Sequence, residues 1–227
     1  MLESGQERIL IIAPHADDEV LGCGGLIEKA CKHGNVVKVV IAAVGHTNFR
    51  HNEKTITSTT RKRELTKALN YLGCTDFEVI YDDKDGLLDT VPQKELVTKI
   101  DKYLNDLRPT MVFIPYPSFH QDHRSLFHAC MAALRPNPNN QYKLIAMFEY
   151  PLMVWQYPKI GDLGELYLDI SETVNKKIEA LLKHRSQIRE EDHLIAPAGA
   201  KEWARKCGQE IGVDHAEKYY ILQARLL

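Results

Sequence analysis

The feature that most limits the fold is a regular alternation of short apolar segments with longer amphipathic ones. The apolar segments have the length and β-branched composition of buried strands, and the amphipathic segments have helical periodicity. Strands separated by helical crossovers form a mostly parallel sheet, so the sequence predicts an α/β fold with helices on both faces of the sheet. The expected strands are 8–13, 36–44, 76–81 and 111–115, and the expected helices are 20–33, 59–72, 91–107 and 124–134.

Beyond residue 136 the alternation is less regular. The turn-forming segment RPNPNN is followed by an expected strand at 142–150, expected helices at 171–188 and 198–211, and an expected strand at 218–226. The length of 227 residues fits one domain that buries about 70% of its unfolded surface. We therefore expect a single domain over 1–227, with a motif-bearing core of about 8–135 and a less regular C-terminal part, 136–227.

Composition disfavours several classes of protein. Lys and Arg total 29 against 31 for Asp and Glu, and the resulting net charge of −2 argues against nucleic-acid binding. The five cysteines form no CxxC pair, so neither a disulfide framework nor an all-cysteine zinc site is indicated. The apolar run at 9–13 is too short for a signal peptide, and no segment approaches the roughly 18 apolar residues of a membrane helix. We therefore expect a cytoplasmic protein without stable membrane insertion.

The segment ILIIAPHADDEVLGCGG places polar residues between an expected strand and an expected helix. Open α/β sheets bind ligands beyond the carboxyl ends of their strands, so His15, Asp17 and Asp18 lie where chemistry is expected. A tight turn can aim His15 and one carboxylate at a metal ion while the other carboxylate faces the same space as a base. The alternative is that Asp17 or Asp18 caps the helix. The GCGG that follows does not match GxGxxG, so we expect these glycines to permit close helix–sheet packing.

A second polar segment, HQDHR, follows the expected strand at 111–115 in the same way. Its two histidines and one aspartate can supply a metal ligand, a catalytic imidazole and a carboxylate that orients a ring. Two such clusters at strand ends of one parallel sheet can converge on one edge. The resulting ligand set is His15, Asp18 and His123, and three protein ligands with an open position for water are typical of catalytic zinc sites.

These two segments together resemble the motifs of the PIG-L/LmbE-like family of zinc-dependent N-deacetylases, which are usually written AHPDDE and HxDH. Here the first motif reads PHADDE, with Pro and Ala exchanged around the histidine, and the second reads HQDH. The residues of the first motif that match are His15, Asp17, Asp18 and Glu19. A third segment, RKRELTKALNYLG, is similar to an Arg-x-x-Glu…Leu-Gly helix of the family and matches Arg61 and Glu64. The resemblance covers about residues 8–135.

The resemblance implies a Rossmann-like fold and one zinc ion per subunit. The implied zinc ligands are His15, Asp18 and His123. Asp17 matches the general base of the family, and His120 matches the histidine that assists the transition state. Asp122 matches the carboxylate that orients or tunes that histidine. Arg61 matches a residue that binds substrate, and His215 lies in an acidic, aromatic C-terminal stretch that approaches the pocket in the family, so we expect it to contact substrate.

The remaining histidines show no such pattern. We expect His46 and His51 to lie on a polar rim at the surface, His33 to favour a helix dipole, His128 to pack, and His184 and His193 to be solvated. The aromatic segment YPLMVWQYP at 150–158 is expected in the core or at a subunit interface, which would suit a homo-oligomer. Its alternative role is a wall against which a sugar ring stacks.

The function implied by the resemblance is hydrolysis of the N-acetyl group of an N-acetylglucosamine-containing glycoside or glycoconjugate, by zinc-bound water with Asp17 as base. The substrate would be a small amino-sugar molecule. One alternative is an amidase for another N-acyl conjugate, and a second is a non-catalytic metal- or sugar-binding module. Asp17 and His120 argue against the second alternative, because a pure binder needs no base beside the metal. A nicotinamide-binding Rossmann protein is a third alternative.

Overall fold

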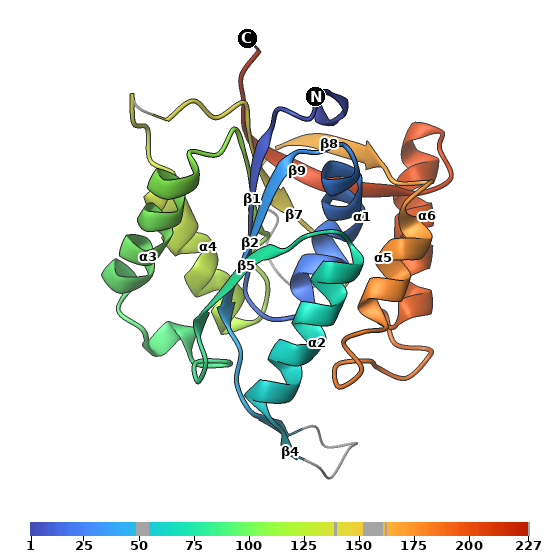
Figure 1. Ribbon diagram of the computed structural model, residues 1–227, viewed down its shortest axis with the longest axis horizontal. Helices are drawn as coiled ribbons and strands as arrows, with labels where there is room; N and C mark the ends of the chain where they lie inside the picture. The colour runs from blue at the N-terminus through green and yellow to red at the C-terminus, as the bar shows by residue number, and fades with distance from the viewer. Residues whose placement is uncertain (49–54, 139, 152–160, 162, 227) are drawn as a thin grey trace.

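The computed structural model describes residues 1–48, 55–138, 140–151, 161 and 163–226. Its centre is a seven-stranded sheet with the strand order β5-β2-β1-β6-β7-β9-β8 (Figure 1). The strands from β5 to β7 run parallel to one another, and β9 runs antiparallel to both β7 and β8. The strands are β1 (Arg8–Ala13), β2 (Val36–Ala43), β5 (Asp76–Tyr81), β6 (Met111–Pro115), β7 (Leu144–Phe148), β8 (Gly164–Asp169) and β9 (Ala216–Ala224), and β3 (Thr47–Asn48) pairs separately with β4 (Thr55–Ile56).

Helices cover both faces of the sheet. In Figure 1, α1, α2, α5 and α6 lie on one side of the sheet, and α3 and α4 lie on the other. The predicted α/β class, with a mostly parallel sheet and helices on both faces, is therefore confirmed. The helices are α1 (Asp18–Lys32), α2 (Ser58–Tyr71), α3 (Gln93–Leu107), α4 (Gln121–Ala133), α5 (Val174–Leu181) and α6 (Pro197–Ile211), with short 3-10 turns η1 (Leu2–Ser4) and η2 (Leu88–Thr90).

The largest differences from the sequence prediction lie in the C-terminal part. Strand β8 was not predicted, because it is an edge strand whose residues are mostly exposed or half-buried and give little hydrophobic signal. The helix expected at 171–188 is shorter, since α5 ends at Leu181 and the chain then runs irregularly to α6. Helices α1 and α4 both begin earlier than expected, so that the polar motifs occupy their first turns.

The central strands carry the core. Residues 9–13 of β1 are completely buried, which fits a strand that is covered by helices on both faces. Helix α1 approaches the sheet closely at Gly22, where an added Cβ would lie 2.2 Å from Cδ2 of Phe148 on β7. Gly22 therefore permits close helix–sheet packing, as the sequence predicts, and Gly24 permits close approach to Lys177 on α5.

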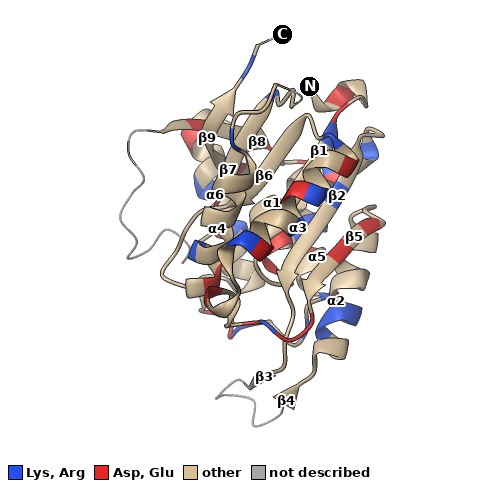
Figure 2. Cartoon of the chain, turned by 90° about the vertical axis from the view of Figure 1, so that its left-hand side faces the viewer, with Lys and Arg blue, Asp and Glu red and all other residues tan. Residues whose placement is uncertain are grey.

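Both chain termini lie at the end of the sheet away from the carboxyl ends of the parallel strands (Figure 1). Acidic and basic residues are interspersed along the elements drawn in Figure 2, in keeping with the near-zero net charge. None of the helices in the described part of the chain combines the length and apolar character needed to span a bilayer.

Candidate metal centre and active site

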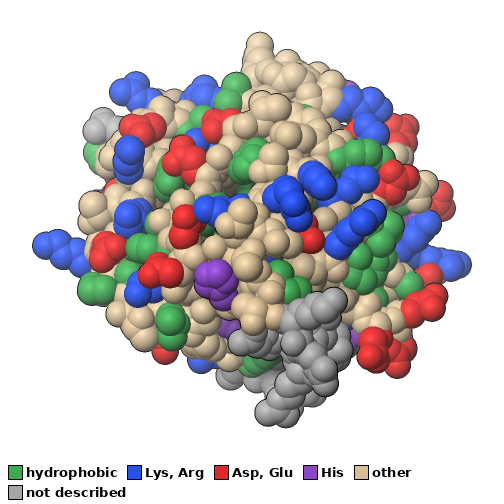
Figure 3. Space-filling view, turned by 60° about the horizontal axis from the view of Figure 1, so that its bottom comes forward, with side chains coloured by type: hydrophobic (Ala, Val, Ile, Leu, Met, Phe, Trp, Pro, Cys, Tyr) green, Lys and Arg blue, Asp and Glu red, His purple; other side chains and the backbone are tan. Residues whose placement is uncertain are grey.

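Two turns at the carboxyl ends of β1 and β6 build the site. The turn from β1 to α1 carries His15, Asp17 and Asp18, and His120 is the residue before α4, whose first turn contains Asp122 and His123. Because β1 and β6 are parallel neighbours, the two turns meet at one edge of the sheet. They border a cavity of about 270 Å³, and Figure 3 looks onto this end of the molecule, where a histidine side chain reaches the surface near Lys and Arg side chains.

The sequence-predicted residues that line this cavity are His15, Asp17, Asp18, Arg61, His120 and His123. Neither Asp17 nor Asp18 caps α1. Asp17 occupies the N-cap position but makes no side-chain cap hydrogen bond, and Asp18 Oδ2 instead accepts the backbone N–H of His15 at 3.0 Å. The capping alternative therefore does not describe these carboxylates.

Three donor atoms are arranged for a metal ion. Asp18 Oδ2 lies 3.3 Å from His15 Nδ1 and 3.3 Å from His123 Nε2, and all three side chains are buried. Tetrahedral zinc with ligand bonds of about 2.0–2.1 Å holds its ligand atoms about 3.3 Å apart. The nitrogen and oxygen donors are also of the type that zinc binds. The residues present therefore fit a zinc-like divalent ion, and the described residues contain a candidate metal cluster at His15, Asp18 and His123.

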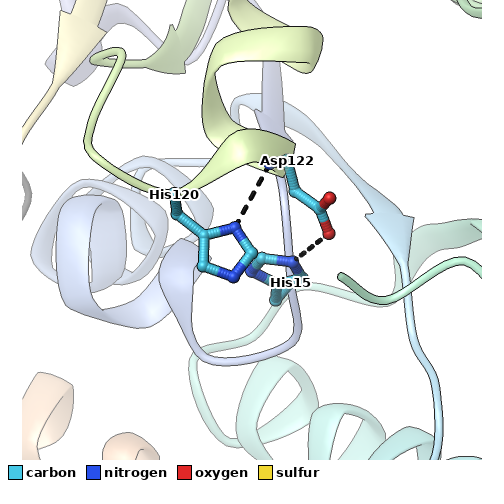
Figure 4. Close-up of side chains that lie close together, drawn as sticks. All are labelled: His15, His120 and Asp122. Atoms are coloured by element: carbon cyan, nitrogen blue, oxygen red, sulfur yellow. Dashed lines mark hydrogen bonds and ion pairs between the residues drawn. The ribbon is translucent and has the colours of Figure 1, made fainter. Parts of the chain in front are cut away.

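The other nitrogen of His15 faces Asp122. His15 Nε2 lies 2.8 Å from Asp122 Oδ2, and Figure 4 shows the carboxylate pointing at the His15 ring. Metal-binding histidines usually donate their second N–H to a carboxylate, and this contact keeps a proton on Nε2, so that Nδ1 is the nitrogen that can exchange its proton for a metal ion. Burial opposes a charge on His15, but the hydrogen bonds to Asp122 and Asp18 outweigh it and raise the pKa of the ring to about 10.

Asp122 also belongs to a second group of possible metal donors, with His15 and His120. Its two oxygens, however, accept backbone N–H groups. Oδ2 accepts that of Gly86 at 2.6 Å and Oδ1 accepts that of Leu88 at 2.9 Å. A fully buried carboxylate that is bound in this way is better suited to orient His15 than to bind a metal directly.

The relation between Asp122 and His120 differs from the sequence expectation. The carboxylate was expected to orient His120, but it contacts His15, and His120 Nδ1 instead accepts the backbone N–H of Asp122 at 3.2 Å (Figure 4). The first turn of α4 produces this bond, because a side chain at the N-cap can accept a free backbone N–H of the helix. Burial, with the nearby rings of His15 and His123, lowers the pKa of His120. Its other nitrogen, Nε2, is then the hydrogen-bearing one.

Asp17 has unusual backbone and electrostatic properties. Its φ of 121° lies in a region that residues with a Cβ rarely adopt. Burial raises the pKa of its carboxyl group, and the neighbouring Asp18 raises it further, to about 7. A carboxyl group with a pKa near the operating pH can both accept and return a proton.

Arg61 reaches the cavity from the first turn of α2 and is 3% exposed. Its guanidinium forms an ion pair with Asp85, which the sequence analysis did not single out. Asp85 Oδ1 also lies 3.8 Å from His15 Nε2. Asp85 therefore links the predicted substrate-binding arginine to the metal cluster.

Several cavity residues were missed: Ser118 and Phe119 directly precede the HQDHR segment, and no local motif surrounds the others. Tyr150 belongs to the aromatic segment expected in the core or at an interface, and its buried hydroxyl donates to Asp18 Oδ1. The rest of that segment, 152–158, lies outside the described residues. The other missed lining residues are Asp85, Ser118, Phe119, Gln187, Arg189 and Ile195. The polar run HRSQIR at 184–189 follows an amphipathic helix, and this polarity is the sequence feature that could have indicated Gln187 and Arg189.

The histidine assignments need three corrections. His184 was expected to be solvated, but it is 1% exposed and its Nε2 lies 3.0 Å from Glu19 Oε1. His128 was expected to pack, but it is exposed on α4. His215 was expected to contact substrate, but it is not among the described residues that line the cavity. It lies just before β9, where its backbone N–H donates to the Ser171 hydroxyl and its carbonyl accepts the N–H of Ile170. His46 is exposed, as expected, and His51 lies outside the described residues.

Comparison with known proteins identifies the family of the chain. The family model described as PIG-L, GlcNAc-PI de-N-acetylase, matches residues 10–134, which is more than half of the chain and includes both strand-end turns. The chain belongs to the PIG-L family. This is the family that the motifs indicated, and its model is named for a de-N-acetylase.

Individual PIG-L relatives extend over most of the chain. A probable N-acetyl-alpha-D-glucosaminyl L-malate deacetylase 2 of Bacillus subtilis is 27% identical, over 80% of this chain and 84% of its own. The diacetylchitobiose deacetylase of Thermococcus kodakarensis is 25% identical, over 82% of this chain and 72% of its own. The crystal structure of the conserved protein TT1542 from Thermus thermophilus superposes with a TM-score of 0.73 and 26% identity, covering 98% of this chain and 97% of that one.

Proposed function

We propose that this member of the PIG-L family is a zinc-dependent hydrolase that removes the N-acetyl group from an N-acetylglucosamine-containing glycoside or glycoconjugate. The observation that carries the proposal is the buried group of His15, Asp18 and His123, with donor atoms at tetrahedral spacing, beside an aspartate in the same cavity. The relatives named for deacetylation of N-acetylglucosaminyl malate and of diacetylchitobiose support an N-acetylglucosamine group as the part of the substrate that is deacetylated.

One zinc ion per subunit would be held by His15, Asp18 and His123. When bound, such an ion supplies Lewis acidity, which makes water more acidic and polarises an amide carbonyl. Asp122 holds the His15 ring through Nε2, and Tyr150 holds the carboxylate of Asp18, so the ligands are fixed before the metal arrives. Fixed ligands keep the geometry of an open catalytic site.

Asp17 is the general base. Its carboxylate lines the cavity and accepts a proton from the attacking water, and its pKa of about 7 suits this exchange near neutral pH. His120 also lines the cavity. Because its Nδ1 accepts the backbone N–H of Asp122, the ring hydrogen lies on Nε2. This N–H can donate to the amide oxygen of the substrate as negative charge develops there. Arg61, held by Asp85, lies where it can bind the polar part of the substrate.

The experiment is metal analysis of the purified protein combined with an acetate-release screen over N-acetylated amino sugars, with Asp17→Asn as the control. We expect about one zinc per chain, acetate release from N-acetylglucosamine derivatives, and loss of release in the control at unchanged zinc content. Turnover of longer N-acyl conjugates without acetate release would favour a different amidase. Metal binding without turnover of any substrate would indicate a binding module and contradict the proposal.

A further inference from the structure

The backbone of Asp17 is strained. Its φ of 121° and ψ of −30° place it outside the regions that are comfortable for a residue with a Cβ. Such a conformation persists only when the surrounding structure holds it, and strained residues of this kind cluster at functional sites. The question is which contacts hold Asp17, because those contacts also determine where its carboxylate points.

The Asp17 carbonyl accepts the backbone N–H groups of Val20 and Leu21, as in any helix start, and the side-chain contact on its backbone comes from Glu19. Glu19 Oε2 accepts the backbone N–H of Asp17 at 2.8 Å, and the Glu19 side chain is completely buried. The other oxygen of Glu19, Oε1, lies 3.0 Å from His184 Nε2. His184 is 1% exposed and follows α5, so the pair connects the C-terminal part of the chain to the turn after β1.

The segment that carries His184 is itself fixed. Two residues further along, the backbone N–H and hydroxyl of Ser186 donate to the carboxylate of Glu64 on α2, with distances of 2.6–3.2 Å. Gln187, the next residue, lines the cavity. A continuous set of hydrogen bonds therefore runs from α2 through the segment after α5 to Glu19 and the backbone of Asp17.

We propose that Glu19 and His184 form a buried pair that holds Asp17 in its strained conformation and so keeps its carboxylate in the cavity. Both are positioning residues for the reaction proposed above, and the inference rests on that function for its catalytic meaning. Stability alone is a poor explanation for the pair, because a buried ion pair can often be replaced by apolar residues without loss of stability. The hydrogen bond from the strained Asp17 backbone to Glu19 is a better explanation for a buried ion pair at this position.

The fold contains a matched pair away from the cavity. Lys177 Nζ lies 2.7 Å from Glu217 Oε1, and both residues are 4% exposed. Glu217 also accepts the backbone N–H groups of Gly25 and Leu26 in α1, and neither partner lines the cavity. Glu217, like Glu19, is a buried carboxylate that pairs with a basic side chain and accepts backbone N–H groups, so it controls for the loss of a buried ion pair as such.

The first experiment compares the turnover of Glu19→Ala, Glu19→Gln and Glu217→Ala at a temperature below all of their melting transitions. Without Glu19 the Asp17 backbone relaxes, so kcat should fall by about 10²-fold, with KM and metal content nearly unchanged. The amide oxygen of Glu19→Gln can still accept the same N–H and should restore most of the loss. Glu217→Ala should lose stability but keep kcat.

A second pair of variants covers the case in which Glu19→Ala does not fold. His184→Ala removes the donor to Glu19 and should lower kcat, whereas the amide group of His184→Gln still donates and should restore it. The inference is overturned if Glu19→Ala or His184→Ala keeps the parental kcat per bound metal, or if Glu217→Ala loses as much. If Asp17→Asn itself stays active, the proposed base fails instead, so the two failures are distinct.

The third experiment measures strain without any activity. Glycine tolerates a positive φ and alanine does not, so Asp17→Gly should melt at a higher temperature than Asp17→Ala. If Glu19 imposes the conformation, this difference should disappear when both variants also carry Glu19→Ala, because the backbone is then free to relax. An equal difference in both backgrounds would show that Glu19 does not hold Asp17, whatever the protein hydrolyses.

Discussion

The cavity has two kinds of wall, and they come from different parts of the chain. The turns after β1 and β6 supply the metal donors and the candidate base, within a few residues of each strand end. The C-terminal part supplies Tyr150, Gln187, Arg189 and Ile195, none of which belongs to the metal cluster. The first wall, formed by the turns after β1 and β6, holds the metal donors and the candidate base in short local segments. The second wall, formed by the C-terminal part, supports these residues through contacts between positions far apart in sequence.

The comparison predicts that substitutions in the first wall have the larger effects, beginning with His123→Ala. This change removes one of three donors, so zinc content should fall to background and acetate release should fall with it. Metal analysis after gel filtration and an activity assay measure both quantities. The exposed His128 on the same helix provides the control, because His128→Ala should retain zinc and full activity. A zinc-loaded His123→Ala protein would remove this residue from the ligand set.

A smaller effect is expected for Asp122→Asn, which changes the carboxylate that holds His15. Partners of metal-bound histidines typically contribute about 10- to 100-fold to metal affinity or activity, so we expect a loss in that range. Titration with a competing chelator measures the affinity. Asp85→Asn is the matched control, because its carboxylate lies 3.8 Å from the same nitrogen instead of 2.8 Å and should contribute less. Equal losses in the two variants would contradict the special role of Asp122.

The pH dependence of zinc binding tests the same wall without a substitution. Before metal binds, His15 has a pKa raised to about 10, so at pH 7 its ring is protonated and zinc must displace a proton. Because higher pH favours the deprotonated ring, affinity should increase by up to about tenfold per pH unit between pH 7 and 9. Competition titrations at several pH values measure the slope. A flat profile would indicate that zinc displaces no proton from His15 in this range.

The smallest effect is expected in the second wall, for Tyr150→Phe. The change removes only the hydroxyl that donates to Asp18 Oδ1 and leaves the ring in place. A single hydrogen bond contributes about 0.5–1.5 kcal/mol, so zinc affinity should fall about 2- to 10-fold. The same chelator competition measures it beside Asp122→Asn. A loss larger than that of Asp122→Asn would reverse the proposed order of the two walls.

The sequence predicts the first wall well because both of its segments are local. A buried strand, a polar turn and a helix can be recognised from about twenty consecutive residues, and the α/β pattern then brings two such turns together. The parallel strands β1, β5 and β6 were predicted with their observed bounds for the same reason. The cores of β1 and β6 are continuous apolar runs, which few other structures tolerate, whereas the edge strand β5 mixes apolar residues with Asp76 and Glu78.

The second wall could not be predicted in this way. The burial of His184 depends on Glu19, which is 165 positions away in the sequence, and the neighbouring charged residues of His184 favour a solvated helix. The role of Asp122 was misjudged because sequence spacing cannot show which of two histidine rings a carboxylate faces. Edge strand β8 and the early end of α5 also depend on tertiary contacts, because their own residues give weak or misleading signals.

The strand order has a consequence for how substrate range can change. From β1 the chain crosses to β2 on one side, and from β6 it crosses to β7 on the other, so the metal cluster sits where the connections diverge. Ile195 borders the opening from the C-terminal part of the chain, apart from the two turns that hold the ligands and from the residues that contact Glu19 and Glu64, so it can vary without disturbing the ligands. An engineer who wanted a new specificity could exchange residues near Ile195 and leave the metal donors and their supports in place. In this fold, the residues that hold the metal ion and some of the residues that contact substrate can therefore change independently.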